Sequence, residues 1–375
     1  MILEEFASHI SEICSRTRLA AERPLLWTVI ANPRAGGFTI KSRWKGHLAM
    51  LEACVEKAKK NPARKAAAGP SRTGLQMGNS LGLITTNAPL HAKEIAGLLI
   101  EEAAKTASLK ENQRPFYLII TSGGDGTSLE VMTSLFHAPE NVRCNFAVLR
   151  LPMGTGNDGA DAWELDKALD LLIEPAQVKR QRAVRLKTSA GKGPFLAFNI
   201  LSVGLDAFVT HMTNKMKGKL PGDSYKLWVD IAALFYDRVY RVDYMDVRSL
   251  DEKKREVKSF REKVLLLAVG ESGKRTYGSH KWILPDDRNV CVMRQMPVFR
   301  KLALKGLFNT GGHIDKPEAI LWNAHAVEFS ARCPILAQMD GETVLLEKND
   351  FPAVIELTEP VIPIISNIIK KGDMF

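Results

Sequence analysis

Runs of apolar residues alternate with amphipathic segments through the first half of the chain. Four apolar runs have the length of buried strands, namely LLWTVIA (25–31), LGLITT (81–86), FYLIIT (116–121) and FAVLRLP (146–152). Between and after them, Leu, Ile, Val and Ala recur at helical spacing around residues 41–60, 91–106, 128–137 and 164–173. This strand–helix order predicts a mostly parallel sheet covered by helices.

The pattern changes near residue 178. The later runs FLAFNILSVG, KVLLLAVG, NVCVM, HAVEFSA and PAVIEL are strand-like and have few long helices between them, which predicts a mainly antiparallel sheet. One helix is predicted at residues 224–239, with an apolar stripe formed by Leu227, Trp228, Ile231, Leu234 and Phe235. A stripe of this kind favours packing in a core over contact with lipid.

A chain of 375 residues exceeds the size at which one hydrophobic core stops growing, so we expect two domains. We assign residues 1–177 to the first domain and residues 178–350 to the second. Residues 351–375 then form a C-terminal strand or tail that can return to the first domain. Within the first domain, residues 1–22 are an extension, and residues 61–80, small, basic and rich in turn formers, form a surface insertion.

Composition indicates a cytoplasmic protein. The chain is 45% hydrophobic and 25% charged, and no apolar run approaches the roughly 20 residues that cross a bilayer. Glu4 and Glu5 stand where a signal peptide would carry basic residues. The cysteines have no metal-ligand spacing, so we expect reduced thiols at Cys14, Cys54, Cys144, Cys291 and Cys333.

The formal net charge of +10 favours phosphate-bearing partners, whether nucleotides, nucleic acid or an anionic membrane surface, unless it is only a basic surface without a partner. The sequence has neither a basic helix nor an aromatic–basic sheet motif. We therefore expect no binding to nucleic acid.

Glycine-rich turns follow three of the predicted strands: NPRAGG at 32–37, SGGDGT at 122–127 and LPMGTGND at 151–158. Glycine lets a backbone approach a ligand closely, and a turn from strand to helix directs free N–H groups at a bound phosphate. The carboxyl ends of parallel strands lie at one edge of the sheet. Neither a GxxxxGK[ST] loop nor a GxGxxG turn after the first strand is present.

Asp125 lies inside the second of these turns. A carboxylate beside bound phosphate repels it unless Mg²⁺ lies between them or the carboxylate handles a proton. The late segment QMDGE at 338–342 is either a hairpin turn at Asp340-Gly341 or a further acidic site.

The combination of GGDGT with LPMGTGND resembles the diacylglycerol kinase catalytic domain superfamily, which includes sphingosine kinases, ceramide kinases and bacterial lipid kinases. Further segments follow the order of that family from about residue 25 to the end of the chain. They are NPRAGG, TTNAPLHAKEIA (85–96), NILSVGLDAFV (199–209), PGDSYKLW (221–228) and QMDGE. GGDGT alone is shared with NAD kinases.

The resemblance implies a Rossmann-like three-layer α/β nucleotide-binding domain followed by an antiparallel β-sandwich domain. Its cofactors are ATP, as the substrate, and Mg²⁺. It implies that Glu342 is the general base and that Asp125 lies beside Mg²⁺ and the γ-phosphate, although in some relatives this aspartate is itself the base. The residues implied to bind ATP are Asn32, Pro33, Arg34, Ala35, Gly36, Thr86, Gly123, Gly124, Asp125, Gly126, Thr127, Gly154, Thr155 and Asn157.

The sequence departs from the family pattern at three positions. Ala35 replaces a serine of the opening motif, and Leu129 replaces the asparagine of the bacterial GGDGTxNE motif. In bacterial members a metal site lies near a P-x-A-x-x-D-G-x-L segment, which PDDRNVCV at 285–292 matches in part. Asp287 is the implied metal ligand there, and Arg288 replaces the glycine.

The leading hypothesis is an ATP-dependent lipid kinase that acts at the cytoplasmic face of a membrane. Its acceptor stays open among diacylglycerol, a sphingoid base, phosphatidylglycerol and an isoprenoid alcohol. Two alternatives are an NAD kinase-like enzyme with a soluble acceptor and an inactive nucleotide-binding relative. The expected partners are ATP, a lipid substrate and an anionic membrane surface, with formation of a homodimer left open.

Overall fold

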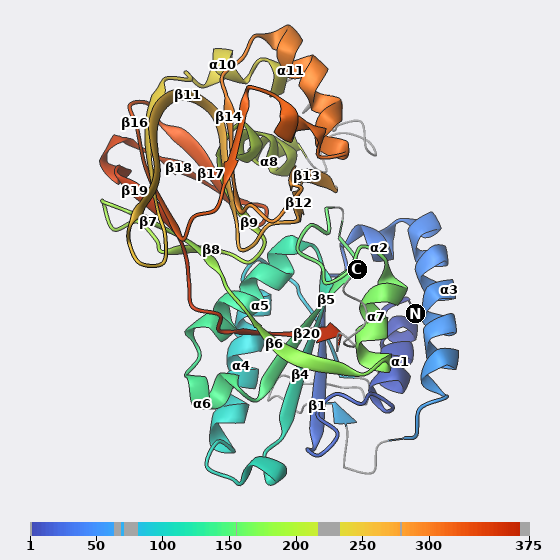
Figure 1. Ribbon diagram of the computed structural model, residues 1–375. Helices are drawn as coiled ribbons and strands as arrows, with labels where there is room; N and C mark the ends of the chain where they lie inside the picture. Colours follow the sequence, from blue (N-terminus) through green and yellow to red (C-terminus); the bar gives the residue numbers. More distant parts are fainter. Residues whose placement is uncertain are drawn as a thin grey trace. The chain divides into compact units, whose positions relative to one another are not determined.

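The computed structural model describes residues 2–63, 69–70, 82–154, 156–216, 233–277 and 280–367. The chain forms two compact units, shown in Figure 1. Unit 1 comprises residues 1–181 and 361–375, and unit 2 comprises residues 182–360. The chain therefore leaves unit 1 once and returns to it near the C-terminus.

A seven-stranded sheet forms the centre of unit 1, with the strand order β2-β1-β4-β5-β20-β6 and with β3 also paired to β1. All of its pairings are parallel except that of β20 with β6. All eight residues of β4 are buried, which explains why this strand is continuously apolar. The strands are β1 Leu25–Ala31, β2 Gly69–Pro70, β3 Leu83–Thr85, β4 Phe116–Gly123, β5 Phe146–Pro152, β6 Ala176–Gln181 and β20 Ile362–Asn367.

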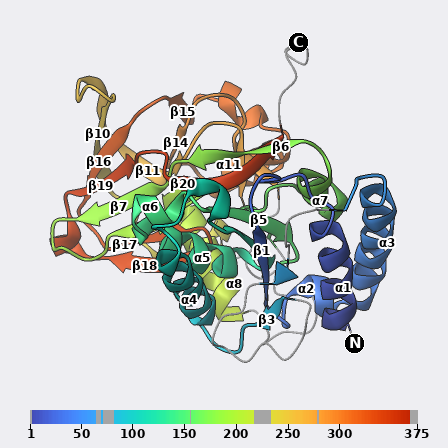
Figure 2. The ribbon, with the colours of Figure 1, turned by 90° about the horizontal axis from the view of Figure 1, so that it is seen from below.

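Helices cover both faces of this sheet (Figures 1 and 2). One face carries α1 Ile2–Cys14, α3 Lys41–Ala58 and α7 Leu165–Ile173, with the short α2 Gly36–Thr39 beside them. Their apolar sides pack on Leu118 and Leu149 of the sheet. The other face carries α4 His91–Lys105, α5 Asp125–His137 and α6 Glu140–Arg143, with the 3₁₀ turn η1 Glu111–Gln113 before β4. On this second face, the rings of Tyr117 and Phe146 stack with their centroids 5.0 Å apart.

Unit 2 is an antiparallel β structure built around the long strand β11 Glu256–Gly270. The first half of β11 pairs with β10, and its second half pairs with β9 and β14. Strand β11 thus joins the strands on its two sides into one eleven-stranded sheet, and residues from both parts share an apolar core. The strands are β7 Val184–Thr188, β8 Phe195–Ala197, β9 Ile200–Gly204, β10 Tyr244–Leu250, β12 Arg275–Tyr277, β13 Lys281–Leu284, β14 Val290–Arg294, β15 Ala319–Trp322, β16 Ala326–Ala331, β17 Ile335–Met339, β18 Glu342–Leu346 and β19 Ala353–Leu357.

Three described α-helices belong to unit 2, together with three 3₁₀ turns. The helices are α8 Leu205–Met216, α10 Tyr236–Val239 and α11 Val298–Lys305, and the turns are η2 Gly306–Asn309, η3 Gly312–Asp315 and η4 Lys348–Asp350. Within the part of the chain that the structure describes, no helix is both long and apolar enough to span a bilayer.

The predicted fold class is confirmed: a largely parallel α/β sheet comes first, and an antiparallel β structure follows. Several predicted features lie outside the described residues. They are most of the insertion at 61–80, the motif at 221–228 and all but the last part of the helix at 224–239, of which α10 is described.

A buried ion pair holds the segment that follows β5. Arg150 interrupts the apolar run of this strand, and its side chain and that of Asp161 are each 5% exposed. The guanidinium Nη2 lies 2.7 Å from Asp161 Oδ1, and Asp161 Oδ2 accepts a hydrogen bond from the Arg150 backbone N–H at 2.7 Å. Nη2 also donates to Gln181 at 3.3 Å. The segment 153–161 therefore starts and ends at the same strand.

Replacing Asp161 should destabilise unit 1 strongly. Asp161→Ala leaves the Arg150 guanidinium buried without its counter-charge, so we expect the free energy of unfolding to fall by about 3–5 kcal/mol. Urea denaturation followed by tryptophan fluorescence measures this change. The control is Glu56→Ala, which removes an exposed ion pair with Lys59 and should cost at most about 1 kcal/mol. Equal losses in the two variants would contradict the assigned role of the buried pair.

Candidate functional site

Three turns of unit 1 lie side by side at the carboxyl edge of its sheet. They follow the neighbouring parallel strands β1, β4 and β5, in whose register Ala31 is opposite Ser122 and Gly123 is opposite Pro152. The backbone N–H of Asn32 donates to Ser122 O at 3.0 Å, so the pairing of the first two strands continues into the turns.

The first turn is fixed by its own hydrogen bonds and by one to the third turn. Asn32 Oδ1 accepts from the Arg34 N–H at 2.9 Å, and Asn32 O accepts from the Ala35 N–H at 3.0 Å. The Gly37 N–H donates to Met153 O at 2.9 Å, where a Cβ on residue 37 would lie only 3.0 Å from that oxygen. These bonds leave the Arg34 side chain exposed at the edge of the sheet.

Thr86 adjoins the first turn from the end of β3. Its backbone N–H donates to Ala31 O at 2.8 Å, and its hydroxyl lies 3.5 Å from the same oxygen. The structure thus brings Thr86 to the edge at which the three glycine-rich turns meet.

The second turn packs tightly on one side only. A Cβ on Gly123 would lie 2.4 Å from Thr127 Oγ1, so this position accepts no larger residue without movement. Among the described residues, no atom lies within 4 Å of the position that a Cβ on Gly124 would take. Asp125 then begins the 13-residue helix α5, whose first N–H groups lie at this edge.

The third turn contacts the second through glycine. A Cβ on Gly154 would lie 2.7 Å from the Gly124 Cα, so these two backbones touch. Asn157 has a φ of +59° and donates from Nδ2 to Pro152 O at 3.2 Å, which closes the turn. Thr155, the predicted ATP contact in this turn, lies outside the described residues.

Two carboxylates converge on the third turn. Asp125 Oδ1 accepts a hydrogen bond from the Gly159 N–H at 3.1 Å. The position of a Cβ on Gly156 lies 3.0 Å from Asp125 Oδ2 and 3.1 Å from Asp158 Oδ2. Asp158 was not among the predicted site residues. The signal for it was its place in the motif, directly after Asn157.

The other predicted acidic residues belong to unit 2. Glu342 is exposed and begins β18, and Asp340 and Gly341, with φ values of +43° and +99°, form the two-residue turn from β17. The Asp340 carboxylate accepts hydrogen bonds from the backbone N–H groups of Phe198, Asn199 and Ile200. QMDGE is therefore a hairpin turn, and its aspartate binds the start of β9.

Buried polar side chains also hold this hairpin in place. Asp206, in the first turn of α8, is 4% exposed and accepts from Ser202 Oγ at 2.5 Å and from Gln338 Nε2 at 3.1 Å. Gln338 Oε1 in turn accepts from the Gly341 N–H at 3.2 Å. Burial raises the pKa of Asp206 to about 6, and the hydrogen bonds from Ser202 and Gln338 offset part of that rise.

Asp287, the other predicted metal ligand, lies on the surface of unit 2. Its side chain is 88% exposed and forms an ion pair with Lys274 Nζ at 3.0 Å. The neighbouring Asp286 pairs with Arg288. Among the residues that the structure describes, no group of three or more His, Cys, Asp or Glu side chains could hold a metal ion.

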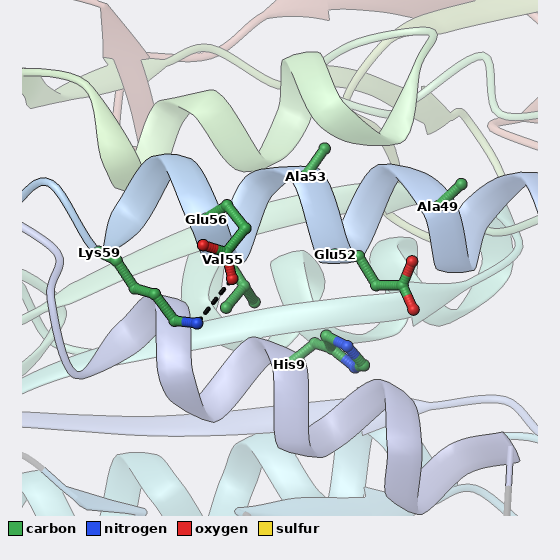
Figure 3. Close-up of a pocket in the computed structure, with 7 residues that line it drawn as sticks. All are labelled: His9, Ala49, Glu52, Ala53, Val55, Glu56 and Lys59. Carbon is green, nitrogen blue, oxygen red and sulfur yellow. Dashed lines mark hydrogen bonds and ion pairs between the residues drawn. The ribbon is translucent and has the colours of Figure 1, made fainter.

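A shallow groove in unit 1 is separate from the turns. It lies between α1 and the later half of α3, and Figure 3 shows the seven residues that line it, His9, Ala49, Glu52, Ala53, Val55, Glu56 and Lys59. Lys59 Nζ is paired with Glu56 at 2.6 Å, and His9 Nδ1 bonds to Glu5 O at 2.7 Å. Lys59, Glu56 and His9 therefore already have partners within α1 and α3, and we do not assign a ligand to this groove.

Comparisons with known proteins show which family the first part of the chain matches. Residues 26–188 match the family model described as the diacylglycerol kinase catalytic domain. A probable lipid kinase YegS-like of Yersinia enterocolitica is 34% identical over 108 residues, which is 28% of this chain and 35% of that relative. Its counterpart from Yersinia pestis is 32% identical over the same shares. The matched segment thus spans about a third of these relatives.

Two solved structures share the fold over nearly the whole chain. Both are described as putative diacylglycerol kinases from Bacillus anthracis. One has a TM-score of 0.56 at 18% identity and covers 91% of this chain and 95% of its own. The other has a TM-score of 0.52 at 20% identity and covers 91% and 97%.

The buried Asp206 should make stability depend on pH. Its pKa is about 6 when folded and near 3.8 when unfolded, so the unfolded chain releases this proton first as the pH rises. Stability from this group is therefore lost between about pH 4 and pH 6, by on the order of 3 kcal/mol. Urea unfolding of the wild type and Asp206→Asn at intervals from pH 4 to pH 7 should show their difference growing across that window. A constant difference would contradict the assignment.

Proposed function

Because residues 26–188 belong to the diacylglycerol kinase catalytic domain family, we propose that the protein is a kinase that transfers the γ-phosphate of ATP to a hydroxyl of a lipid. The observation that carries the proposal is the meeting of three glycine-rich turns and two carboxylates at one edge of the sheet. The kinase family accounts for a phosphotransferase, and the names of the Yersinia relatives favour a lipid acceptor.

Backbone groups would bind the phosphates of ATP. The N-terminus of α5 would offer backbone N–H groups, and among the described residues the space that a Cβ on Gly124 would take is open. The exposed guanidinium of Arg34 would add a positive charge on the first turn. Asn32, which follows β1, and Thr86, which follows β3, would position the nucleotide.

Asp125 and Asp158 fit Mg²⁺, since both present carboxylate oxygens beside Gly156 and Mg²⁺ prefers oxygen ligands. When bound, Mg²⁺ would neutralise negative charge on the phosphates. The Gly159 N–H donates to one oxygen of Asp125 and so helps to orient this carboxylate. The exposed Asp287, already paired with Lys274, is a weaker candidate.

Glu342 would act as the general base. In the transfer, the acceptor oxygen bonds to the γ-phosphorus, the bond from that phosphorus to the β-phosphate bridging oxygen breaks, and ADP leaves. The hydroxyl proton passes to the Glu342 carboxylate as the new bond forms. The hydrogen bonds of Asp340 and Gln338 hold the turn that carries Glu342, so this carboxylate starts from a fixed backbone.

Purified protein should transfer label from γ-labelled ATP to a component of a total lipid extract in the presence of Mg²⁺. Asp125→Asn keeps an oxygen for the Gly159 N–H but loses the charge, so turnover should fall by at least about 10³-fold with the fold intact. Extraction into organic solvent and identification of the labelled product measure the reaction. The control is Glu252→Gln, an exposed glutamate of unit 2 that should retain full activity.

The Glu342→Gln variant tests whether Glu342 acts as a general base or has only a structural role. As a base, Glu342 should contribute about 10²–10⁴-fold to kcat while nucleotide affinity changes little. Loss of nucleotide binding in this variant would exclude that role. Label found only in soluble products would favour an NAD kinase-like enzyme, and nucleotide binding without transfer to any acceptor would indicate an inactive relative.

A further inference from the structure

Exposed apolar side chains gather on two short helices of unit 2. Phe299 and Leu302 on α11 are 85% and 49% exposed, and Val239 at the end of α10 is 65% exposed. Phe235, directly before α10, is 39% exposed. Figure 1 shows α10 and α11 next to each other within this unit. Large apolar side chains with such exposure, grouped together, mark a contact surface.

Buried contacts hold the two helices together. Lys301 of α11 is 5% exposed, and its Nζ lies 3.0 Å from Asp237 Oδ1 of α10. Gln295 donates to the other oxygen of Asp237 at 2.7 Å. Tyr236 and Leu304 enter the same apolar core. Since the inward positions are filled, Phe299 and Leu302, three residues apart, are presented outward from a fixed base.

Positive charge surrounds these apolar groups. Residues 235–243 and 298–306 contain five Lys or Arg and two Asp. Lys301 is buried against Asp237, Arg300 pairs with Glu318, and Arg241 Nη2 lies 3.8 Å from Asp243 Oδ2. Arg238, Arg241 and Lys305 are exposed, and the Arg238 guanidinium lies 5.4 Å from the ring centre of Phe235. The cores of protein–protein interfaces are depleted of lysine and of acidic residues, whereas arginine is enriched there. Apolar side chains among basic ones instead complement an anionic lipid surface.

We propose that α10 and α11 form a membrane-docking surface for anionic bilayers. Phe299 and Leu302 enter the boundary between headgroups and acyl chains, while Arg238 and Arg241 bind the anionic headgroups. The inference rests on the proposed function for its purpose, since a lipid acceptor requires contact with a bilayer. The electrostatic contribution of the basic residues and the apolar contribution of the inserted side chains are each modest, so binding needs both.

Sedimentation with vesicles, without nucleotide, tests this surface. The wild type should bind vesicles of equal parts phosphatidylglycerol and phosphatidylcholine, and should bind pure phosphatidylcholine weakly. Phe299→Ser with Leu302→Ser should weaken binding roughly tenfold or more. Arg238→Gln with Arg241→Gln should remove the preference for phosphatidylglycerol and its sensitivity to salt. The control is Val257→Ser, an exposed residue of β11 that should change nothing.

Vesicle binding of the Phe299→Ser, Leu302→Ser variant equal to that of the wild type would overturn the proposal. So would a wild-type dimer that becomes monomeric in this variant by sedimentation velocity, because a second copy would then cover the patch. The kinase proposal is judged separately, with a short-chain acceptor dissolved below its aggregation limit. There the variant should match the wild type. Absence of any transfer by a wild type that still binds vesicles would refute the kinase proposal alone.

Discussion

Parallel pairing of β1, β4 and β5 is the constraint on which the candidate site depends. Parallel neighbours end at the same edge of a sheet, so turns that start at residues 32, 122 and 151 come together there. Contact between Gly124 and Gly154 then fixes the distance between two of these turns, because no Cβ stands between them. The carboxylates of Asp125 and Asp158 both lie beside Gly156, close to this contact.

The two units position their acidic residues in different ways. In unit 1, Asp125 sits at the start of a helix and is oriented by one backbone N–H from the next turn. In unit 2, the Asp340 carboxylate accepts hydrogen bonds from three consecutive backbone N–H groups. These bonds hold the hairpin on which Glu342 is exposed. The first arrangement places a carboxylate among the glycine-rich turns, and in the second one acidic residue holds the turn that carries another.

Much of the fold could be predicted from local pattern. The apolar runs at 25–31 and 146–152 coincide with β1 and β5, since a strand buried on both faces is continuously apolar. Helix α5 begins at Asp125, three residues before the predicted start at 128, because Asp125-Gly126-Thr127 carries no apolar periodicity. Asp340-Gly341 favours the positive φ values of a two-residue hairpin, so this turn could also be predicted from the sequence.

The sequence by itself determined the strand–helix order, the glycine-rich turns and the acidic residues within them, because these depend on spacing within a few residues. Only the tertiary structure decided which partners the buried charged and polar side chains bind. The Arg150–Asp161 pair, the Asp206–Gln338 network and the ion pair between α10 and α11 join residues from separate elements. No local pattern encodes such partners, since burial and hydrogen bonding follow from which surfaces the packed chain brings together.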